Sequence, residues 1–596
     1  MMRTASCCLV LLLVFPTVYG AQGRGDGRQA AAEPRAWIDV SNKHAQVLLD
    51  VLARFAPEGA GQLGVTGLDR EVTSLTPDSL LQQRQATDGA LARLNTLLAA
   101  EQDSLVKQDL EILIHSAQNQ VHGLELSEDR LLPYTDVTAL VYRGVRSLLD
   151  AQVEPERRAA AVERLRKYAG LDGGREPIAT QAMKLTGARF TNPKLLAPAR
   201  SEVERDLANG PVLVAGMEKL FQQFAVEGWR EPFDKVRDQL TAYEQFVRTE
   251  ILPKARTDFR LPADLYAFQL EEVGVALTPE PLAQLAHDAF RQIQGDMERL
   301  APRVARARGL QTNDYREVIR ALKKEQLVGD AILPHYRKRL EEIEAIVRKE
   351  QLVTLPDRAA RIRIATDAEA AQTPAPNMRP PRLLGNTGEL GEFVLPLNVP
   401  SAPGAAAGAG HLDDFTFAAA SWTLTAHEAR PGHKMQFAKM LEAGVSIPRA
   451  VFAFNSTNVE GWGLYAEWMM LPYMPDDGQL ISLQFRLLRA ARAFLDPELH
   501  MGRVTPDEAR RVLRDEVCLS LAMTESEVER YMFRSPGQAT SYFYGYTQLQ
   551  ELRTATERAM GSRFNPREFH DYILAQGLLP PALLKAAVLQ HFAAAR

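Results

Sequence analysis

Apolar side chains recur three and four positions apart over most of this chain, which is the spacing of one face of an α-helix. The pattern starts at Trp37, continues to about Leu352, and returns from Phe415 to the C-terminus. The chain is therefore predicted to be mainly α-helical, with amphipathic helices packed around a large core. A clear example of the spacing is the run Val47, Leu48, Val51, Leu52 and Phe55.

A break in this pattern lies between about Thr373 and Leu412, where Pro, Gly, Ala and Asn are frequent and helix is disfavoured. Within the break, residues 392–399 alternate enough to predict a short strand or an extended hairpin arm. Such an arm either holds an extended peptide by strand addition or has a purely structural role. The break divides the chain into an N-terminal helical part, 37–372, and a second helical part, 373–596.

Residues 1–20 have the features of a secretory signal peptide. A positive charge precedes a short apolar stretch from Cys7 to Val14, and small residues follow it. The stretch is too short to span a bilayer, so we expect cleavage near Gly20, export to the periplasm or the cell exterior, and no stable membrane insertion. Residues 21–36 are small and polar and predict a flexible spacer. An uncleaved N-terminal anchor is the alternative interpretation.

Composition narrows the class of protein but does not identify its chemistry. The 596 residues include 75 acidic and 70 basic side chains, which gives a net charge of −5. There is no basic excess that would favour binding to nucleic acid. After removal of the signal, Cys518 would be the one remaining cysteine, so no intrachain disulfide is expected.

Candidate chemistry concentrates in the run 425–433, Thr-Ala-His-Glu-Ala-Arg-Pro-Gly-His. Two histidines beside a glutamate are what a zinc hydrolase needs, because neutral imidazoles bind the ion and a carboxylate such as Glu428 accepts a proton from water. His427 and His433 are six residues apart, and a regular helix would leave them about 120° out of line. Because Pro431 lacks an N–H, the helix must break there, and the break could turn His433 back toward a shared ion.

A second run, 458–467, supplies carboxylates. Glu460 follows His433 by 27 residues, which is enough for a second helix to return antiparallel, and we expect it to be the third metal ligand. Glu467 lies two turns further along the same helix, about 10 Å away, so it is assigned a role behind the ligands or toward the substrate. The alternative is that the histidines end helices and Glu460 is a solvated carboxylate.

These runs resemble the largely bacterial family catalogued as domain of unknown function 885. Its members carry His-Glu-x-x-Pro-Gly-His followed by Glu-Gly-Trp-x-Leu-Tyr-x-Glu, which match residues 427–433 and 460–467. Lys434 departs from the family, in which a second histidine is usual. The resemblance implies a zinc peptidase similar to the gluzincin group, with a large helical, angiotensin-converting-enzyme-like or oligopeptidase-like fold. It also implies a cleft between two helical halves and a short β arm beside the active site. Further matching segments are 57–68, 496–500, 535–539 and 563–580.

Peptide hydrolysis also needs hydrogen-bond donors for the developing oxyanion, and peptidases of this type supply Tyr or His from a later helix. We favour Tyr542 and His500 for this role. Tyr544 and Tyr546 follow in the same run and are candidates for substrate contact. A stripe of tyrosines in the core is the alternative interpretation.

Arg489 and Arg492 are candidates to bind a carboxylate of the substrate. Arginines at this helical spacing are also typical of a charged surface. Both interpretations therefore stay open at this point.

Together these features predict an exported zinc-dependent metallopeptidase that hydrolyses short peptides, as a carboxypeptidase, dipeptidase or oligopeptidase. Zn²⁺ is expected on His427, His433 and Glu460, with Glu428 as the general base. The N-terminal part is expected to cover the cleft as a lid that excludes folded proteins. The rival prediction is a non-catalytic exported helical protein that binds peptides or metal in the same cleft. Hydrolysis of another amide or an ester would use the same groups, and the oligomeric state stays open.

Overall fold

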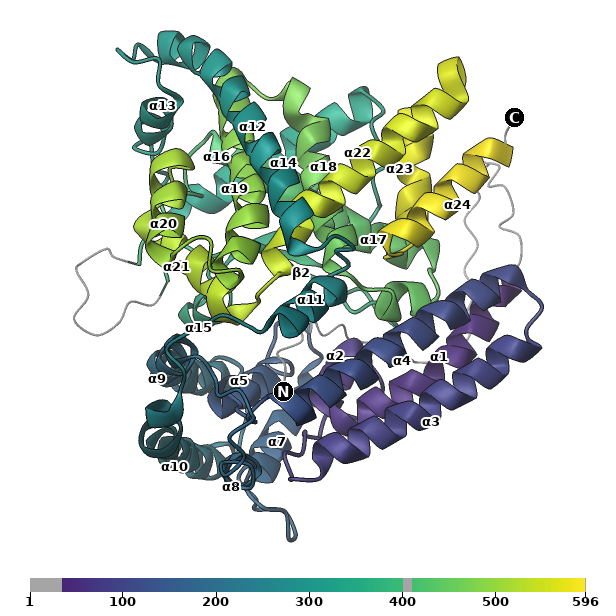
Figure 1. The fold of residues 1–596 in the computed structure, drawn as a ribbon, viewed down its shortest axis with the longest axis vertical. Helices are drawn as coiled ribbons and strands as arrows, with labels where there is room; N and C mark the ends of the chain where they lie inside the picture. Colours follow the sequence, from purple (N-terminus) through teal and green to yellow (C-terminus); the bar gives the residue numbers. More distant parts are fainter. Residues whose placement is uncertain (1–34, 400–409, 595–596) are drawn as a thin grey trace.

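Helices dominate the protein, as the spacing of apolar residues predicts (Figure 1). The computed structural model describes residues 35–399 and 410–594. The predicted signal peptide and nearly all of the predicted spacer lie outside these ranges. Within the described part, no helix combines the length and the apolar character that a membrane span requires.

The first ten helices form the lower half of the molecule in Figure 1. Three long helices, α1, α3 and α4, pack against one another, and α5 and α7 to α10 enclose a separate core. This half consists of α1 (Ala36–Phe55), α2 (Pro57–Leu63), α3 (Ser79–Ala100), α4 (Ser104–Arg130), α5 (Val137–Arg146), α6 (Pro155–Arg158), α7 (Ala160–Tyr168), α8 (Ile178–Gly187), α9 (Arg200–Gln223), α10 (Arg230–Phe246), η1 (Val247–Ile251) and η2 (Leu252–Lys254).

The upper half begins with α11 (Ala263–Glu272), α12 (Pro279–Arg308), α13 (Tyr315–Leu322), η3 (Gly329–Ala331) and α14 (Ile332–Lys349). After the sheet region come α16 (Ala420–Leu424), η4 (Thr425–Ala429), α17 (His433–Ala443), η5 (Pro448–Phe452), α18 (Ser456–Met470), η6 (Leu471–Tyr473) and α19 (Asp476–His500). The chain ends with α20 (Pro506–Arg511), η7 (Val512–Glu516), α21 (Leu521–Glu529), η8 (Arg530–Arg534), η9 (Gln538–Thr540), α22 (Ser541–Met560), η10 (Gly561–Arg563), α23 (Pro566–Ala575) and α24 (Pro581–Ala594).

The predicted division of the chain at residue 372 is not the division between the cores. One core combines buried side chains of α11 to α14, from Tyr266 to Leu340, with buried side chains between Leu412 and Tyr544. The long helices α12 and α19 pack together within it, as Figure 1 shows. A loss of helical periodicity marks a change in local structure, whereas it does not tell which helices share a core, so the boundary at residue 372 stays a prediction.

A small sheet occupies the break in helical periodicity. Its strands are β1 (Arg361–Ile364), β2 (Asn377–Arg379) and β3 (Glu392–Leu395), in the order β1-β3-β2, and the short helix α15 (Asp367–Gln372) lies between the first two along the chain. β3 runs parallel to β1 and antiparallel to β2, with Phe393 opposite both Ile362 and Met378. Because both edges of β3 are paired within the sheet, residues 392–395 have no free edge for strand addition of a peptide, which favours the structural alternative.

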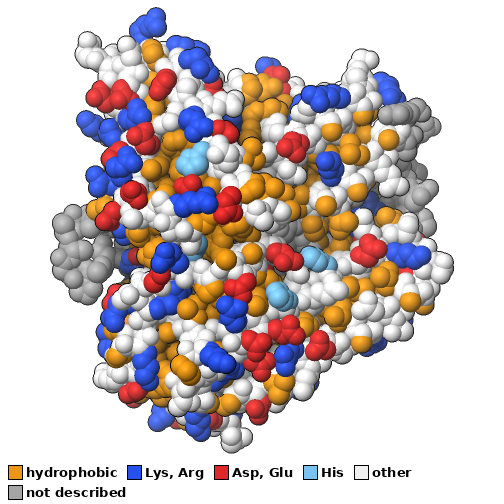
Figure 2. Space-filling view, viewed as in Figure 1, with side chains coloured by type: hydrophobic (Ala, Val, Ile, Leu, Met, Phe, Trp, Pro, Cys, Tyr) orange, Lys and Arg blue, Asp and Glu red, His pale blue; other side chains and the backbone are white. Residues whose placement is uncertain are grey.

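Charged side chains of both signs share the surface. On the face shown in Figure 2, basic and acidic groups are interspersed and form no continuous basic stripe. This distribution agrees with the nearly balanced count of acidic and basic residues.

Candidate metal centre

The predicted helix break at Pro431 is present and shapes the centre. His427 and Glu428 lie in η4, which is a π-helical turn, and the chain then leaves helical geometry at Arg430, with φ −135° and ψ 137°. α17 starts at His433. Gly432 is required between them, because a Cβ at this position would lie 1.9 Å from the carbonyl oxygen of His427. The break therefore folds the chain tightly onto itself and brings the second histidine back to the first.

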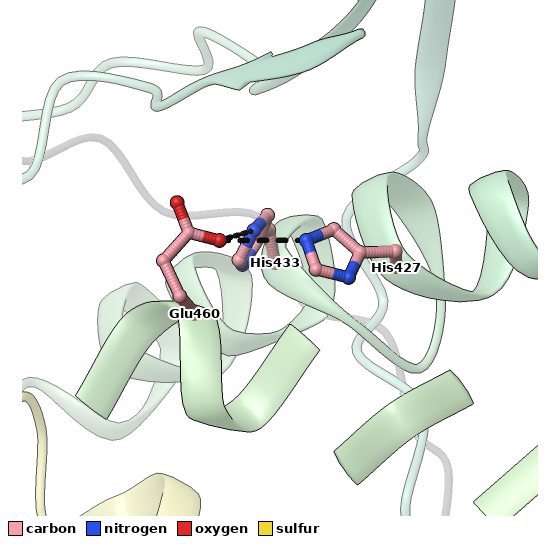
Figure 3. A group of neighbouring side chains, drawn as sticks. All are labelled: His427, His433 and Glu460. Atoms are coloured by element: carbon pink, nitrogen blue, oxygen red, sulfur yellow. Dashed lines mark hydrogen bonds and ion pairs between the residues drawn. The ribbon is translucent and has the colours of Figure 1, made fainter. Parts of the chain in front are cut away.

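Three side chains from η4, α17 and α18 point toward one another (Figure 3). The Oε2 atom of Glu460 lies 3.4 Å from His427 Nε2 and 3.1 Å from His433 Nε2. All three donor atoms lie within 4.8 Å of one another. Ligands placed tetrahedrally about 2.1 Å from a zinc ion would be separated by about 3.4 Å. The geometry thus fits a small tetrahedral divalent ion without large rearrangement.

Glu467 sits behind His427 and orients its ring. The imidazole Nδ1 donates to Glu467 Oε1 at 2.7 Å, so the lone pair of a neutral His427 is on Nε2, the atom that faces Glu460. Glu467 also accepts from Thr423 Oγ1 at 2.5 Å and pairs with Arg489 at 3.3 Å. Burial raises the pKa of Glu467, but Arg489 and His427 outweigh that effect and lower it. A charged carboxylate in this position supports the orientation of the imidazole.

Glu428 is the candidate general base, and its environment is distinct from that of the other carboxylates. Only 6 % of the residue is exposed, its Oε1 lies 4.0 Å from His427 Nε2, and its Oε2 has no partner among the described residues. Burial raises its pKa to about 8, with a smaller opposing effect of His433. A nearby cation would lower this pKa again and leave a carboxylate that can accept a proton near neutral pH.

Glycines in α18 allow the close packing that the centre needs. A Cβ on Gly463 would lie 2.5 Å from His427 Cε1, and a Cβ on Gly461 would lie 2.6 Å from the backbone of Gly545 in α22. Sequence reasoning assigned no role to these glycines. Their spacing could have indicated a packing role, because two glycines within one turn weaken a helix and point to a close contact there.

Tyr542, from the first turn of α22, lies beside the centre. Its ring is nearly parallel to that of His427, with an interplanar angle of 16° and centroids 6.2 Å apart. Its hydroxyl accepts a hydrogen bond from Arg530 Nη2 at 3.0 Å. Burial raises the pKa of Tyr542, Arg530 opposes this effect, and Glu460 adds to it. The phenol is therefore neutral and can donate a hydrogen bond.

The predicted oxyanion role of His500 is wrong. This residue ends α19, and both of its ring nitrogens are occupied by the backbone. The N–H of Leu261 donates to Nδ1 at 3.0 Å, and Nε2 donates to the carbonyl oxygen of Tyr531 at 2.9 Å. Burial lowers the pKa of His500 to about 4, so the ring is neutral. His500 therefore has no donor left for a substrate and connects two chain segments.

Tyr544 and Tyr546 also fail to join the centre. Tyr544 lies 200° around α22 from Tyr542 in helical geometry and packs in the core that contains α12 and α19. The guanidinium carbon of Arg486 lies over the ring of Tyr546, 5.4 Å from the ring centroid. The described structure records no contact of either residue with the three ligands. Tyr544 is a core residue, whereas Tyr546 is partly buried against a different core, so the two do not form one stripe.

Arg489 and Arg492 are buried, so the interpretation as surface charges is wrong. Arg489 supports the centre through its ion pair with Glu467. Arg492 forms a bidentate ion pair with Glu527, with N···O distances of 2.7 and 2.6 Å. Its guanidinium lies 4.6 Å from the centroid of the Tyr542 ring. The binding of a substrate carboxylate by Arg492 would have to compete with that pair. In the structure, Arg492 packs against the ring of Tyr542 and fixes Glu527 beside it.

The segments 496–500 and 535–539, which carry part of the resemblance in the sequence, meet at the turn before α22. Asp496 accepts two hydrogen bonds from the N–H of Gly537, at 2.9 and 3.0 Å, and a third from the hydroxyl of Tyr266 at 2.9 Å. Gly537 has a φ of +81°, a conformation that favours glycine, and it precedes the turn that starts α22. These contacts fix the point at which the helix carrying Tyr542 begins.

Comparison with known proteins agrees with the resemblance in the sequence. The family described as "Bacterial protein of unknown function (DUF885)" matches residues 57–588. The chain belongs to this family. No curated protein matches it.

Two solved structures share the fold of this DUF885 member. A candidate lipoprotein from Colwellia psychrerythraea is 19 % identical, with a TM-score of 0.72 over 94 % of this chain and 99 % of that one. A candidate lipoprotein of unknown function from Shewanella oneidensis is 19 % identical, with a TM-score of 0.70. The match covers 94 % of this chain and 100 % of the Shewanella chain. At this identity the likeness concerns the fold alone.

Proposed function

We propose that this DUF885 protein is a metal-dependent hydrolase that cleaves peptide bonds in short peptides. One observation carries the proposal: Nε2 atoms of His427 and His433 converge on one oxygen of Glu460 beside a buried carboxylate, Glu428, whose Oε2 has no partner among the described residues. A buried carboxylate without a partner is costly unless a ligand, water or cation completes its surroundings. The proposed centre supplies that missing partner.

Zinc suits the donor set best. Two imidazoles and one carboxylate, with one position left open, are typical of catalytic zinc sites, although these ligands also bind manganese or cobalt. A zinc ion bound here would polarise a carbonyl group and make a water molecule more acidic. His427 is ready to bind it, because Glu467 holds the imidazole in the tautomer that leaves Nε2 free.

The remaining steps fall to the side chains around the ligands. Glu428 would take a proton from the attacking water and later deliver it to the leaving amine. Tyr542 would donate a hydrogen bond to the oxyanion that develops on the substrate carbonyl. Glu467 and Arg489 would keep His427 in place and in its tautomer throughout.

The burial of the centre supports short, extended substrates. His427 is 2 % exposed and His433 is 5 % exposed, so a folded protein surface would not reach them. We propose that the N-terminal half covers the approach, since α1 and α4 contact η5, the turn before α18. Export of the protein is proposed as well, with the sequence of residues 1–20 and the candidate lipoproteins of the same fold as support.

One observation favours the rival function, a non-catalytic exported protein that binds peptide or metal. His433 Nδ1 is buried and has no partner among the described residues. Histidines that bind metal usually donate their second nitrogen to a carboxylate, a carbonyl or water, and a ligand without this support binds metal more weakly. The two functions differ in turnover and not in the location of the site.

The test is hydrolysis of a mixed peptide library by the zinc-loaded wild type beside the Glu428→Gln variant. Glutamine keeps the shape of the side chain and removes the base. We expect Glu428→Gln to retain zinc while the hydrolysis rate falls by at least about 10³-fold, because general-base catalysis is lost. Equal cleavage by both proteins would contradict the assignment of the base. Zinc binding without cleavage by the wild type would favour the binding protein.

A further inference from the structure

A largely buried network at the hydroxyl of Tyr542 is not explained by metal binding. It is built around Arg530, the first residue of the π-helical turn η8, and π-helical turns occur frequently at functional sites. Arg530 Nη2 donates to the Tyr542 hydroxyl at 3.0 Å, and the guanidinium lies 5.2 Å from the ring centroid.

The direction of this hydrogen bond determines where the phenolic proton can go. A guanidinium has donors and no acceptor, so the tyrosine oxygen must be the acceptor. The proton of Tyr542 is then left for another acceptor, and among the described residues the structure records none. The ring of His427 lies nearly parallel to that of Tyr542, with the two centroids 6.2 Å apart. The proton is therefore free to be donated to a group bound at the centre, beside which the Tyr542 ring lies.

Arg530 is itself held in a defined place. Its Nε donates to Gln538 Oε1 at 3.1 Å, and its Nη1 lies 3.5 Å from Glu527 Oε1. Glu527 is held in turn by the bidentate ion pair with Arg492 and by a hydrogen bond that the hydroxyl of Tyr531 donates to it at 2.7 Å. The side chain of Glu527 is 2 % exposed, so this support is shielded from solvent.

We propose that Arg530 is a positioning residue that occupies the acceptor side of the Tyr542 hydroxyl and so directs its proton to the reacting oxygen of the substrate. The proposal rests on the hydrolase function proposed above. It assigns to Arg530 no contact with the substrate or the ion. Its effect on the reaction passes entirely through Tyr542.

The test is a double-mutant cycle with Arg530→Met, Tyr542→Phe and the combined variant, assayed for kcat and KM with zinc loaded. We expect Tyr542→Phe to lower kcat by about 10² to 10³-fold, as removal of an oxyanion donor does. Arg530→Met should lower kcat by about tenfold or more with little change in KM, since the hydroxyl is no longer oriented. In the Tyr542→Phe background, Arg530→Met should have no further effect. Arg530→Lys should recover part of the loss, because one donor remains.

The matched control is Arg534→Met, in the same turn, where the arginine pairs with Glu529 at 2.6 Å. It should leave kcat unchanged. The proposal would be overturned if Arg530→Met lowered kcat by the same factor in the wild type and in the Tyr542→Phe variant. A crystal structure of Arg530→Met tests it without turnover, and the hydroxyl of Tyr542 should leave its observed position. If the wild type hydrolyses no peptide, the proposed function fails. The positioning role fails separately if the Tyr542 hydroxyl keeps its position in the crystal structure of Arg530→Met.

Discussion

Two buried histidines, His427 in η4 and His500 at the end of α19, show what separates a candidate ligand from a structural residue. His427 has carboxylates at both nitrogens, Glu467 at Nδ1 and Glu460 near Nε2. His500 has a backbone N–H at one nitrogen and a backbone carbonyl at the other. The carboxylates raise the pKa of His427 against the effect of burial, whereas burial lowers the pKa of His500 to about 4.

The difference lies in the partners and not in burial. A nitrogen that faces a carboxylate across 3.4 Å can accept a cation between the two groups. A nitrogen that completes a backbone hydrogen bond has no capacity left. The two regions can therefore be told apart by experiments that change one and leave the other intact.

The largest effect is expected from Gly463→Ala, which acts on the region of His427 alone. The added methyl group would meet the imidazole at 2.5 Å and push it out of line with Glu460. We expect loss of stoichiometric zinc binding, measured by metal analysis after dialysis. The control is Gly89→Ala in α3, where a Cβ would meet no atom within 4 Å and the stability should rise by up to about 1 kcal/mol. Retained zinc in Gly463→Ala would show that the ring need not be where the structure places it.

A smaller effect separates the two carboxylates that contact His427. Glu460→Gln removes a charged ligand and should abolish tight zinc binding. Glu467→Gln keeps the shape and removes the charge behind the imidazole, so zinc affinity should fall by about 10 to 100-fold. Competition with a fluorescent zinc chelator measures both affinities. If Glu467→Gln proved the more damaging change, the roles of the two residues would be exchanged.

The smallest effect concerns His500 and is confined to stability at acid pH. Its folded-state pKa of about 4 lies below the ordinary value of 6.5. The unfolded chain therefore binds the proton first, and the contribution of His500 to stability is present above pH 6.5 and is lost as the pH falls toward 4. Between pH 7 and pH 5 this amounts to about 2 kcal/mol.

Urea unfolding of the wild type and of His500→Gln at both pH values measures this contribution. The variant should lack this part of the pH dependence and should keep zinc binding and hydrolysis unchanged. Loss of hydrolysis in a stably folded, zinc-loaded His500→Gln would return this residue to the centre.

Local rules predicted the centre well. Pro431 and Gly432 predicted the helix break, because one lacks an N–H and the other tolerates close approach. The seven-residue spacing predicted that Glu460 and Glu467 share one face of a helix, and of the two roles left open for Glu467 the structure favours the one behind His427. The helical character of the chain followed from the spacing of its apolar residues.

Long-range contacts account for what the sequence could not predict. His500 and Arg530 are polar residues in helices. Only their partners, Tyr531 and Tyr542, reveal that one ties backbone segments together and that the other contacts a side chain beside the centre. The core shared by α12 and α19 likewise joins segments almost two hundred residues apart. An apolar stripe predicts that a helix is buried on one face, whereas it does not identify the helix that covers it.

The most direct test is the zinc content of the purified protein, with wild type, His433→Ala and His500→Ala measured side by side after exposure to zinc and dialysis. The account predicts about one zinc per chain in the wild type and in His500→Ala, and none in His433→Ala. Zinc in all three proteins, or in none, would contradict the claim that the turn at Pro431 brings two histidines onto one ion.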